Sequence, residues 1–199
     1  MAQIQAVVLD LGNVVFTWSS EPPSSPNAVP LKAIMKTTTW ADYECGLLTT
    51  MDCYSALGEK FGGSPSDIGQ ALAVARDSLV VNDTLLALIR ELKHSYGLSI
   101  YAMSNISREN IDYLREKHGA ELEIFDEIFA SGYVGMRKPD EGFYRHVIAQ
   151  MGHPADRVAF LDDRKENVQV ACLMGMLGFC YEEPSKAYQW LRNSVSCDA

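Results

Sequence analysis

The N-terminal segment constrains the fold of this chain more than any other stretch. The run from Ile4 to Leu9 is almost wholly apolar and ends abruptly at Asp10. Such a run predicts a strand that is buried on both faces, as in the interior of a parallel sheet. Open α/β sheets bind ligands at the carboxyl ends of their strands, which makes Asp10 the first candidate for chemistry. A lone aspartate after a strand more often begins a turn, so this assignment depends on the rest of the chain.

Length and composition restrict the class of protein. The 199 residues predict one globular domain, or one core with an inserted subdomain, and 47% hydrophobic residues suffice for a buried core. The formal net charge of −9 argues against nucleic acid or an anionic membrane surface as partner, but with a metal ion a phosphate could still bind. We expect no signal peptide and no membrane insertion. Five cysteines without a paired or metal-ligand spacing favour reduced core thiols in a cytoplasmic protein.

The chain divides into regions of different pattern. Residues 19–30 hold four prolines and four serines, which predicts a linker. Residues 31–81 have helical spacing and no convincing strand; Thr50 or Asp52 is expected to cap one helix, and Ser64 with Pro65 to begin another. From residue 83 onward helices and strands alternate, which predicts a doubly wound parallel sheet.

These patterns predict an α/β three-layer sandwich with a small helical cap inserted after the first strand. The core is expected to comprise residues 1–17 and 84–199, and the cap residues 18–83. The expected later strands lie at 98–103, 128–129, 158–161 and 177–181. The expected helices between and after them lie at 85–92, 107–114, 140–151, 166–174 and 187–192.

Polar residues follow three of the predicted strands. They are Asp10, then Ser104 and Asn105, then Asp162 and Asp163. Because parallel strands share a direction, these ends are expected to meet at one edge of the sheet. Lys138, in a loop before a helix, adds a cation. Carboxylates, a hydroxyl and a lysine suit Mg²⁺-assisted phosphoryl transfer on a small-molecule phosphate or diphosphate.

Four stretches in a fixed order carry a resemblance to a known family. They are residues 8–14 (VLDLGNV), 103–105 (MSN), 137–140 (RKPD) and 160–168 (FLDDRKENV). The chain resembles the haloacid dehalogenase (HAD)-like hydrolases of subfamily I, which carry a helical C1-type cap. Residues 40–46 (WADYECG) also resemble the cap helix of phosphatases in this group. The resemblance covers nearly the whole chain and implies a Rossmann-like core, a phosphohydrolase activity and Mg²⁺ as cofactor.

The resemblance also implies roles for the residues that hold the reacting group and the metal. Asp10 would be the nucleophile that forms an aspartyl-phosphate, and also a Mg²⁺ ligand. Asp163 would ligate the ion with Asp162 assisting, and the backbone carbonyl of Gly12 could reach it.

Four further residues would surround this centre. Ser104 would hold the phosphate, and Lys138 would bind both Asp10 and the phosphate. Asn105 would support substrate binding, and Asn167 would be a supporting group.

Gly12 departs from the family pattern. The family usually has a second aspartate two residues after the nucleophile, which serves as general acid and base. A glycine cannot transfer a proton, and such help is commonly worth about 10²–10⁴-fold in rate. Water, a substrate group or a cap residue such as Asp42 or Glu44 could substitute.

Two other functions remain open beside the phosphatase that we favour. Residues 162–166 spell DDxxE, the pattern of diphosphate-binding terpene cyclases, and HAD-like fungal proteins that act on sesquiterpenyl phosphates resemble this chain. A terpene-processing enzyme that ionises or dephosphorylates a prenyl diphosphate is therefore the first alternative. The second is a phosphate-binding module without catalysis, since Gly12 removes the usual acid.

Overall fold

The computed structural model of the 199-residue chain describes residues 3–18 and 30–196. Its centre is a five-stranded sheet with the order β5-β4-β1-β6-β7, and every neighbouring pair is parallel. The strands are β1 (Ala6–Leu9), β4 (Ser99–Ser104), β5 (Glu127–Ala130), β6 (Val158–Asp162) and β7 (Leu177–Cys180). The predicted α/β fold with a parallel sheet is thus confirmed.

β1 is the central strand, and its position explains the N-terminal apolar run. Leu9 pairs with Ala102 of β4 on one side and with Leu161 of β6 on the other. Val7 faces one hydrophobic core and Val8 faces the other, and both side chains are fully buried. A strand with a core on each face has no solvent-facing positions, so apolar and polar residues do not alternate along it.

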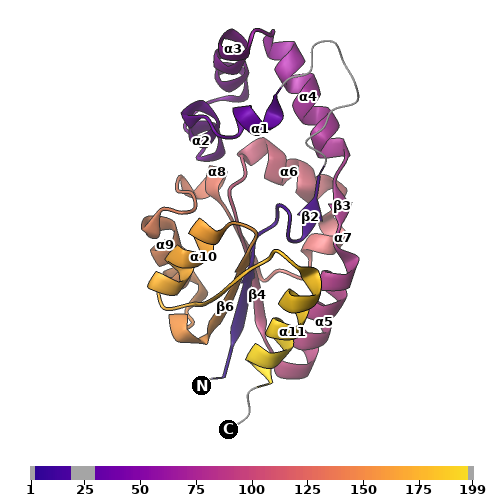
Figure 1. Ribbon diagram of the computed structural model, residues 1–199, viewed down its shortest axis with the longest axis vertical. Helices are drawn as coiled ribbons and strands as arrows, with labels where there is room; N and C mark the ends of the chain where they lie inside the picture. Colours follow the sequence, from indigo (N-terminus) through magenta and orange to yellow (C-terminus); the bar gives the residue numbers. More distant parts are fainter. Residues whose placement is uncertain (1–2, 19–29, 197–199) are drawn as a thin grey trace.

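Helices cover both faces of the sheet (Figure 1). One face packs against α5 (Asp83–Tyr96), α6 (Arg108–Lys117), α7 (Gly119–Leu122) and α11 (Pro184–Val195). The other packs against α9 (Glu141–Met151) and α10 (Lys165–Leu173). The short α8 (Ser131–Val134) follows β5, and a 3₁₀ turn, η1 (Ala155–Arg157), leads into β6. Two helical layers around one sheet make the expected three-layer sandwich.

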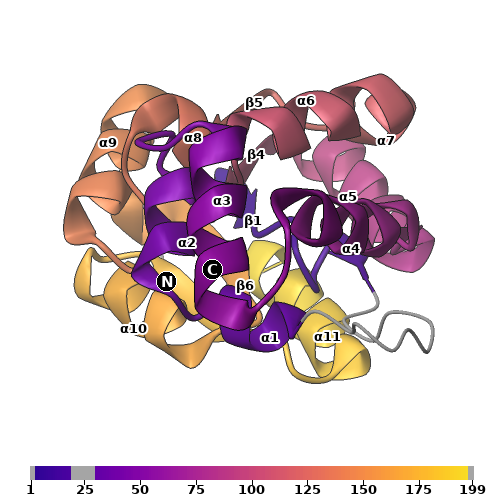
Figure 2. The ribbon, with the colours of Figure 1, turned by 90° about the horizontal axis from the view of Figure 1, so that it is seen from above.

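Four helices sit above the carboxyl end of the sheet (Figures 1 and 2). They are α1 (Leu31–Ile34), α2 (Thr38–Glu44), α3 (Thr50–Phe61) and α4 (Pro65–Asp77), together called the helical lobe below. The lobe has a hydrophobic cluster of its own, formed by Ile34, Trp40, Tyr43, Cys53, Leu57 and Ile68. It is joined to the core through a two-stranded antiparallel ribbon of β2 (Phe16–Thr17) and β3 (Val80–Val81).

Local expectations for the lobe hold in part. Ser64 caps α4 with Pro65 in its first turn, as predicted. The cap of α3 is Thr49 rather than Thr50 or Asp52, since the Thr49 hydroxyl accepts the hydrogen bond from the Asp52 N–H. The expectation of no strand in residues 31–81 is wrong, because β3 pairs with β2. Two residues are too few to show a strand period.

The remaining expectations concern the linker, the cysteines and membrane-spanning helices, and some of these residues lie outside the described part of the chain. Of the predicted Pro- and Ser-rich linker, only Pro30 belongs to the described residues. Cys53 is buried as a core thiol, but Cys172 is exposed, so the core prediction is wrong for Cys172. Cys197 lies outside the described residues. Among residues 3–18 and 30–196, every helix is too short or too polar to cross a bilayer.

Candidate active site

The three central strands bring the predicted polar residues together. Asp10 directly follows β1, and its backbone N–H donates to the carbonyl of Leu161 at 2.8 Å, which continues the ladder with β6. Ser104 ends β4 and Asp162 ends β6, so both lie beside Asp10 at the carboxyl edge. The order β4-β1-β6 is what makes residues distant in sequence neighbours in space.

Lys138 links the three strands through a single ammonium group. Its Nζ donates to the carbonyl of Met103 at 2.6 Å, to Oδ2 of Asp162 at 2.7 Å and to Oδ1 of Asp10 at 2.9 Å. Only 1% of the side chain is exposed, so all three donors of a buried cation have partners. The expected contact between Lys138 and a phosphate would therefore require one of these hydrogen bonds to open.

Asp162 is surrounded by donors from the protein itself. Its Oδ2 accepts from Lys138, and its Oδ1 accepts from the backbone N–H of Arg164 at 2.9 Å and from Nδ2 of Asn167 at 2.8 Å. The side chain is fully buried. The backbone of Asn167 is fixed in turn, because its main-chain carbonyl accepts from the Tyr144 hydroxyl at 2.9 Å. These bonds make Asp162 and Asn167 the support on which Lys138 is oriented.

Asp163 is the half-buried member of the cluster, whereas Asp10 and Asp162 are buried. Its Oδ2 accepts a hydrogen bond from Nδ2 of Asn13 at 2.9 Å. Asn13 has a φ of 57°, the left-handed region that asparagine tolerates better than most residues. In the sequence, Asn13 is part of the motif at residues 8–14, and no role was predicted for it. Its position between a strand-end aspartate and a turn was the available signal.

The carboxylates can hold a divalent cation. One oxygen from each of Asp10, Asp162 and Asp163 lies within 4.8 Å of the other two. Hard cations such as Mg²⁺ prefer oxygen ligands and bind through one or two carboxylates plus water and substrate oxygens. The donor set therefore fits Mg²⁺, with Asp10 and Asp163 as the carboxylates with least competition from protein donors. Glu166, the last member of the DDxxE pattern, pairs with Arg164 on the exposed surface instead of joining this group.

Burial and charge act in opposite directions on the cluster. Burial raises the pKa of Asp10 to about 7, with Asp162 adding to the rise and Lys138 opposing it. Burial alone would lower the pKa of Lys138, but Asp10 and Asp162 outweigh it and raise that pKa. Burial also raises the pKa of Asp163. A nearby cation favours the ionised form of a carboxyl group, so the cluster is best suited to a state in which a metal is bound.

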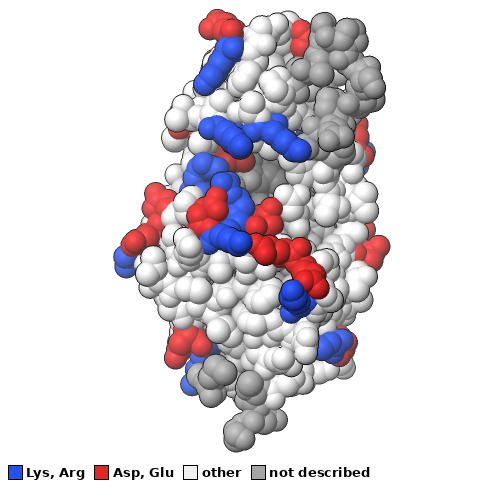
Figure 3. Space-filling model, in the orientation of Figure 1, with Lys and Arg blue, Asp and Glu red and all other residues white. Residues whose placement is uncertain are grey.

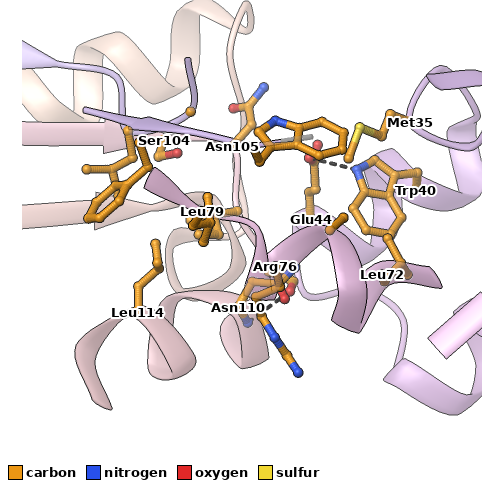
Figure 4. A pocket seen from close by; sticks show the side chains of 17 residues that line it. Met35, Trp40, Glu44, Leu72, Arg76, Leu79, Ser104, Asn105, Asn110 and Leu114 are labelled. Atoms are coloured by element: carbon orange, nitrogen blue, oxygen red, sulfur yellow. Dashed lines mark hydrogen bonds between the residues drawn. The ribbon is translucent and has the colours of Figure 1, made fainter. Parts of the chain in front are cut away.

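A cavity lies between this edge of the sheet and the helical lobe (Figure 4). Ser104 and Asn105 line it from the core, with Gly12 from the loop after β1. Apolar side chains form much of the rest: Phe16, Trp18, Met35, Trp40, Leu72 and Leu79. On the face seen in Figure 3, charged side chains gather in a band below the lobe, where lobe and core meet.

Asn105 and Gly12 differ in what they contribute. The Asn105 side chain donates from Nδ2 to the carbonyl of Lys138 at 2.8 Å and accepts from the Lys138 N–H at 2.7 Å. Its amide thus holds the lysine loop rather than standing free for a substrate. A Cβ placed on Gly12 would meet no atom within 4 Å, and its φ is not in the left-handed region. The space for a larger side chain at this position is therefore open.

Glu44 also lines this cavity, and from the sequence it was predicted only as one of several possible replacements for the missing acid. It ends α2, and its carboxylate accepts from Nε1 of Trp40 at 2.8 Å and from Nη2 of Arg137 at 2.8 Å. Asp42, the other option, is exposed on the same helix. The cap prediction could not tell the two apart, because only the packing of α2 on the core fixes which carboxyl group faces inward.

Two Aspergillus proteins are similar in sequence to this chain over most of its length. Sesquiterpene phosphatase astK of Aspergillus oryzae is 36% identical over 193 residues, which cover 97% of both proteins. Drimenol cyclase drtB of Aspergillus calidoustus is 34% identical over 193 residues, or 96% of this chain. The match covers only 36% of the drimenol cyclase, so this chain corresponds to about a third of that protein.

Solved structures share the fold. HAD family enzyme bt-2542 of Bacteroides thetaiotaomicron, crystallised as a magnesium complex, superimposes with a TM-score of 0.74 at 20% identity. The match covers 94% of this chain and 98% of that one. The profile of the haloacid dehalogenase-like hydrolases matches residues 4–172. The predicted family is thereby confirmed, whereas the cap subtype stays a prediction. With its parallel sheet, its strand-end cluster and this profile match, the chain belongs to the haloacid dehalogenase-like hydrolase family.

Proposed function

We propose that the protein is a Mg²⁺-dependent phosphatase that hydrolyses the phosphate ester of an apolar alcohol through an aspartyl-phosphate on Asp10. The observation that carries this proposal is that a charged surface and an apolar surface meet at the carboxyl edge of the sheet. The charged cluster of Asp10, Lys138 and Asp163 lies at the carboxyl edge, and the cavity that Gly12 and Ser104 line there continues into an apolar wall formed by the lobe. A phosphate ester has the same two parts, an anionic head and an organic group.

The contacts of the site residues support a role for each of them around a bound phosphate. Both hydrogen bonds that Asp10 receives from the described residues, from Leu11 and from Lys138, end on Oδ1. Its Oδ2 is therefore the oxygen suited to attack phosphorus. The Ser104 hydroxyl lines the cavity and would hold a phosphate oxygen. Lys138 favours the ionised form of Asp10 and holds its carboxylate in place.

The metal would be held by Asp10, Asp163 and the Gly12 carbonyl, with Asp162 assisting through Lys138. Bound there, it would neutralise phosphate oxygens and favour the buildup of negative charge in the transition state. Asn13 would orient Asp163 through the 2.9 Å hydrogen bond between them. The helical lobe would act as the cap that selects the organic group.

The substrate class follows from the lining of the cavity and has support among relatives. Trp18, Met35, Trp40 and Leu72 offer an aliphatic or isoprenoid chain an apolar surface. The hydroxyls of a sugar phosphate would find no hydrogen-bond partners on this part of the wall. The similarity to a sesquiterpene phosphatase supports a terpenyl phosphate as the substrate.

The test compares phosphates that share a head and differ in the organic group. Farnesyl phosphate should be hydrolysed in the presence of Mg²⁺, with release of inorganic phosphate and farnesol, while glucose 6-phosphate should react far more slowly. EDTA should abolish the reaction, and Mg²⁺ should restore it. Preference for the sugar phosphate would contradict the substrate class, and phosphate binding without turnover of any ester would favour the non-catalytic module.

The same assay distinguishes the terpene-processing alternative. Farnesyl diphosphate that yields inorganic diphosphate and a hydrocarbon or cyclic alcohol would indicate ionisation of the carbon–oxygen bond. The missing acid at Gly12 and the resemblance to HAD-like fungal proteins still favour that alternative. Its DDxxE pattern gives it no support, because Glu166 pairs with Arg164 on the exposed surface and is not among the three clustered carboxylates. We therefore expect phosphorus–oxygen cleavage.

A further inference from the structure

The proposed reaction lacks one component at the carboxyl edge of the sheet. An alkoxide that leaves phosphorus needs a proton, and Gly12 stands where the family usually has its proton donor. The three N–H bonds of Lys138 are already directed to Met103, Asp10 and Asp162. Asp10 itself must be ionised to attack. The proton has to come from a group outside the strand-end cluster.

We infer that Glu44 of the helical lobe is the general acid and base of this site, in place of the aspartate that Gly12 lacks. The inference rests on the phosphatase function proposed above. Glu44 and Gly12 line the same cavity. Glu44 comes from α2 of the lobe (Figure 4), and Gly12 from the loop after β1. In an in-line displacement the leaving group departs on the side opposite the attacking oxygen. The helical lobe lies above the carboxyl edge that carries Asp10, and Glu44 is the acidic residue that the lobe contributes to the cavity lining.

Two hydrogen bonds hold the Glu44 carboxyl group in one orientation. Trp40 donates to Oε1 and Arg137 donates to Oε2, each at 2.8 Å. A carboxyl group has two lone-pair positions on each oxygen, so a position for the transferred proton remains beside these two bonds. Arg137 directly precedes Lys138 in the chain, which ties the orientation of Glu44 to the loop that holds the nucleophile.

The surroundings of Glu44 allow it to exist in both protonation states near neutral pH. Burial raises its pKa to about 7, although Arg137, the hydrogen bond from Trp40 and the charge of Arg164 act against the rise. The two arginines, from the loop before α9 and from the start of α10, are the charged groups that act on it, and Arg76 of α4 is a further cation that lines the same cavity. The thiols of Cys45 and Cys53 stay neutral, because burial raises the pKa of each. A pKa near the working pH is what an acid–base group needs.

The proton balances over the two half-reactions. In the first, Asp10 Oδ2 forms a bond to phosphorus, the ester oxygen–phosphorus bond breaks, and protonated Glu44 gives its proton to the departing alkoxide. In the second, ionised Glu44 takes a proton from the water that attacks phosphorus, and the bond between phosphorus and Asp10 breaks. Alcohol and inorganic phosphate are released, and Glu44 is protonated again.

A purely structural role for Glu44 predicts different behaviour. Its ion pair with Arg137 and the hydrogen bond from Ser131 Oγ to its carbonyl, at 2.7 Å, also fasten the lobe to the core. Loss of such a fastening would slow every substrate alike. Loss of a proton donor slows a substrate in proportion to the basicity of its leaving group.

The experiment uses Glu44→Gln with benzyl phosphate and 4-nitrophenyl phosphate, which have rings of similar size but very different leaving groups. The quantity is kcat/KM, which reports the steps up to the first cleavage. For benzyl phosphate it should fall by about 10²–10⁴-fold. For 4-nitrophenyl phosphate, whose leaving group needs no proton, it should fall by less than about 10-fold. Asp42→Asn, a matched charge change on the exposed side of α2, should leave both values unchanged.

Each outcome decides one question. Equal losses on both substrates, or no loss on either, would overturn the role of Glu44 while the phosphatase proposal stands. Failure of the unaltered protein to hydrolyse any phosphate ester would overturn the phosphatase proposal itself. In the Glu44→Gln background, Gly12→Asp should restore turnover of benzyl phosphate, because it returns a carboxyl group to a position where an added Cβ meets no atom within 4 Å.

The unaltered protein gives a second test that needs no variant to fold. The ratio of kcat/KM for benzyl phosphate to that for 4-nitrophenyl phosphate should fall as the pH rises through about 7, where Glu44 loses its proton. A ratio that stays constant from pH 5 to pH 9 would overturn the inference.

Discussion

The carboxyl edge of the sheet and the cavity wall above it are built on opposite principles. At the edge, three buried charged groups contact one another: Lys138 forms ion pairs with both Asp10 and Asp162. In the wall, residues such as Trp40 and Leu72 come from separate helices of the lobe, and their contact with the cavity is apolar. The edge is carried by three neighbouring strands, whereas the lobe is joined to the core through two short strands.

This difference separates chemistry from selection. A charge network inside a rigid sheet fixes the reacting atoms, and small displacements there are costly. An apolar wall on separate helices can change its side chains without disturbing that network. Glu44 stands at the boundary, on a lobe helix but bound to the loop that carries Lys138. Variants on the two sides should therefore fail in different ways.

The largest effect is expected at Lys138. Lys138→Met should lower kcat by about 10²–10³-fold or more, because it removes a preorganised charge from the site. It should also destabilise the metal-free protein by about 3–5 kcal/mol, because two buried carboxylates lose their counter-charge. Steady-state kinetics and urea unfolding measure the two effects. Lys165→Met, at an exposed ion pair with Glu182, is the control and should change neither.

Asn13 tests the outer support of the metal site. Asn13→Gly keeps the left-handed backbone but deletes the amide that holds Asp163. The Mg²⁺ concentration for half-maximal activity should rise by about 10–100-fold, as for other losses of a group that orients a metal ligand. The maximal rate at saturating Mg²⁺ should change less. A variant with unchanged Mg²⁺ dependence would show that Asp163 does not contact the ion.

The cavity wall should respond in KM rather than in kcat. Leu72→Ala should raise KM for farnesyl phosphate by about 10-fold, because a few methylenes of apolar contact are lost. The KM for phenyl phosphate should hardly change, because this smaller substrate fills less of the cavity. Leu173→Ala, at a side chain that is 74% exposed on α10, is the matched control. Equal effects on both substrates would contradict the separation of edge and wall.

The smallest effect concerns stability and pH at Glu44. Folding raises its pKa from 4.5 to about 7, so between these values the folded state binds more protons than the unfolded state. Stability from this group is present at low pH and is lost as the pH rises through about 7. Between pH 4.5 and pH 8, the free energy of unfolding of the unaltered protein should therefore fall by on the order of 1–3 kcal/mol relative to that of Glu44→Gln. This corresponds to a decrease of a few degrees in Tm. A constant difference in Tm across this range would contradict the raised pKa.

The sequence predicted the carboxyl edge better than the lobe, for a physical reason. Asp10, Ser104 and Asp162 each follow an apolar strand, and parallel strands in a doubly wound sheet must end together. The order of strands does not predict which hydrogen-bond partner each side-chain atom of the site has. The Asn105 amide binds the Lys138 backbone, and Lys138 has a partner for each of its donors. Both facts depend on side-chain distances, which a sequence pattern does not give.

The lobe was predicted as helices but not in detail. Its strand β3 is only two residues long, and the cap of α3 lies one residue before the expected Thr50. The helical period shows which residues are apolar, but not whether Trp40 faces a cavity or merely another helix. Trp40 does both, since it lies in the lobe cluster and also lines the cavity.

The most direct test of the account is to trap the covalent intermediate. The protein, mixed with Mg²⁺ and farnesyl phosphate and quenched in acid during turnover, should carry one phosphoryl group on the peptide that contains Asp10. Asp10→Asn should neither form this adduct nor turn over. Rapid phosphate release with no phosphoryl group on Asp10, or full activity of Asp10→Asn, would contradict the claim that the charged edge acts through this carboxylate.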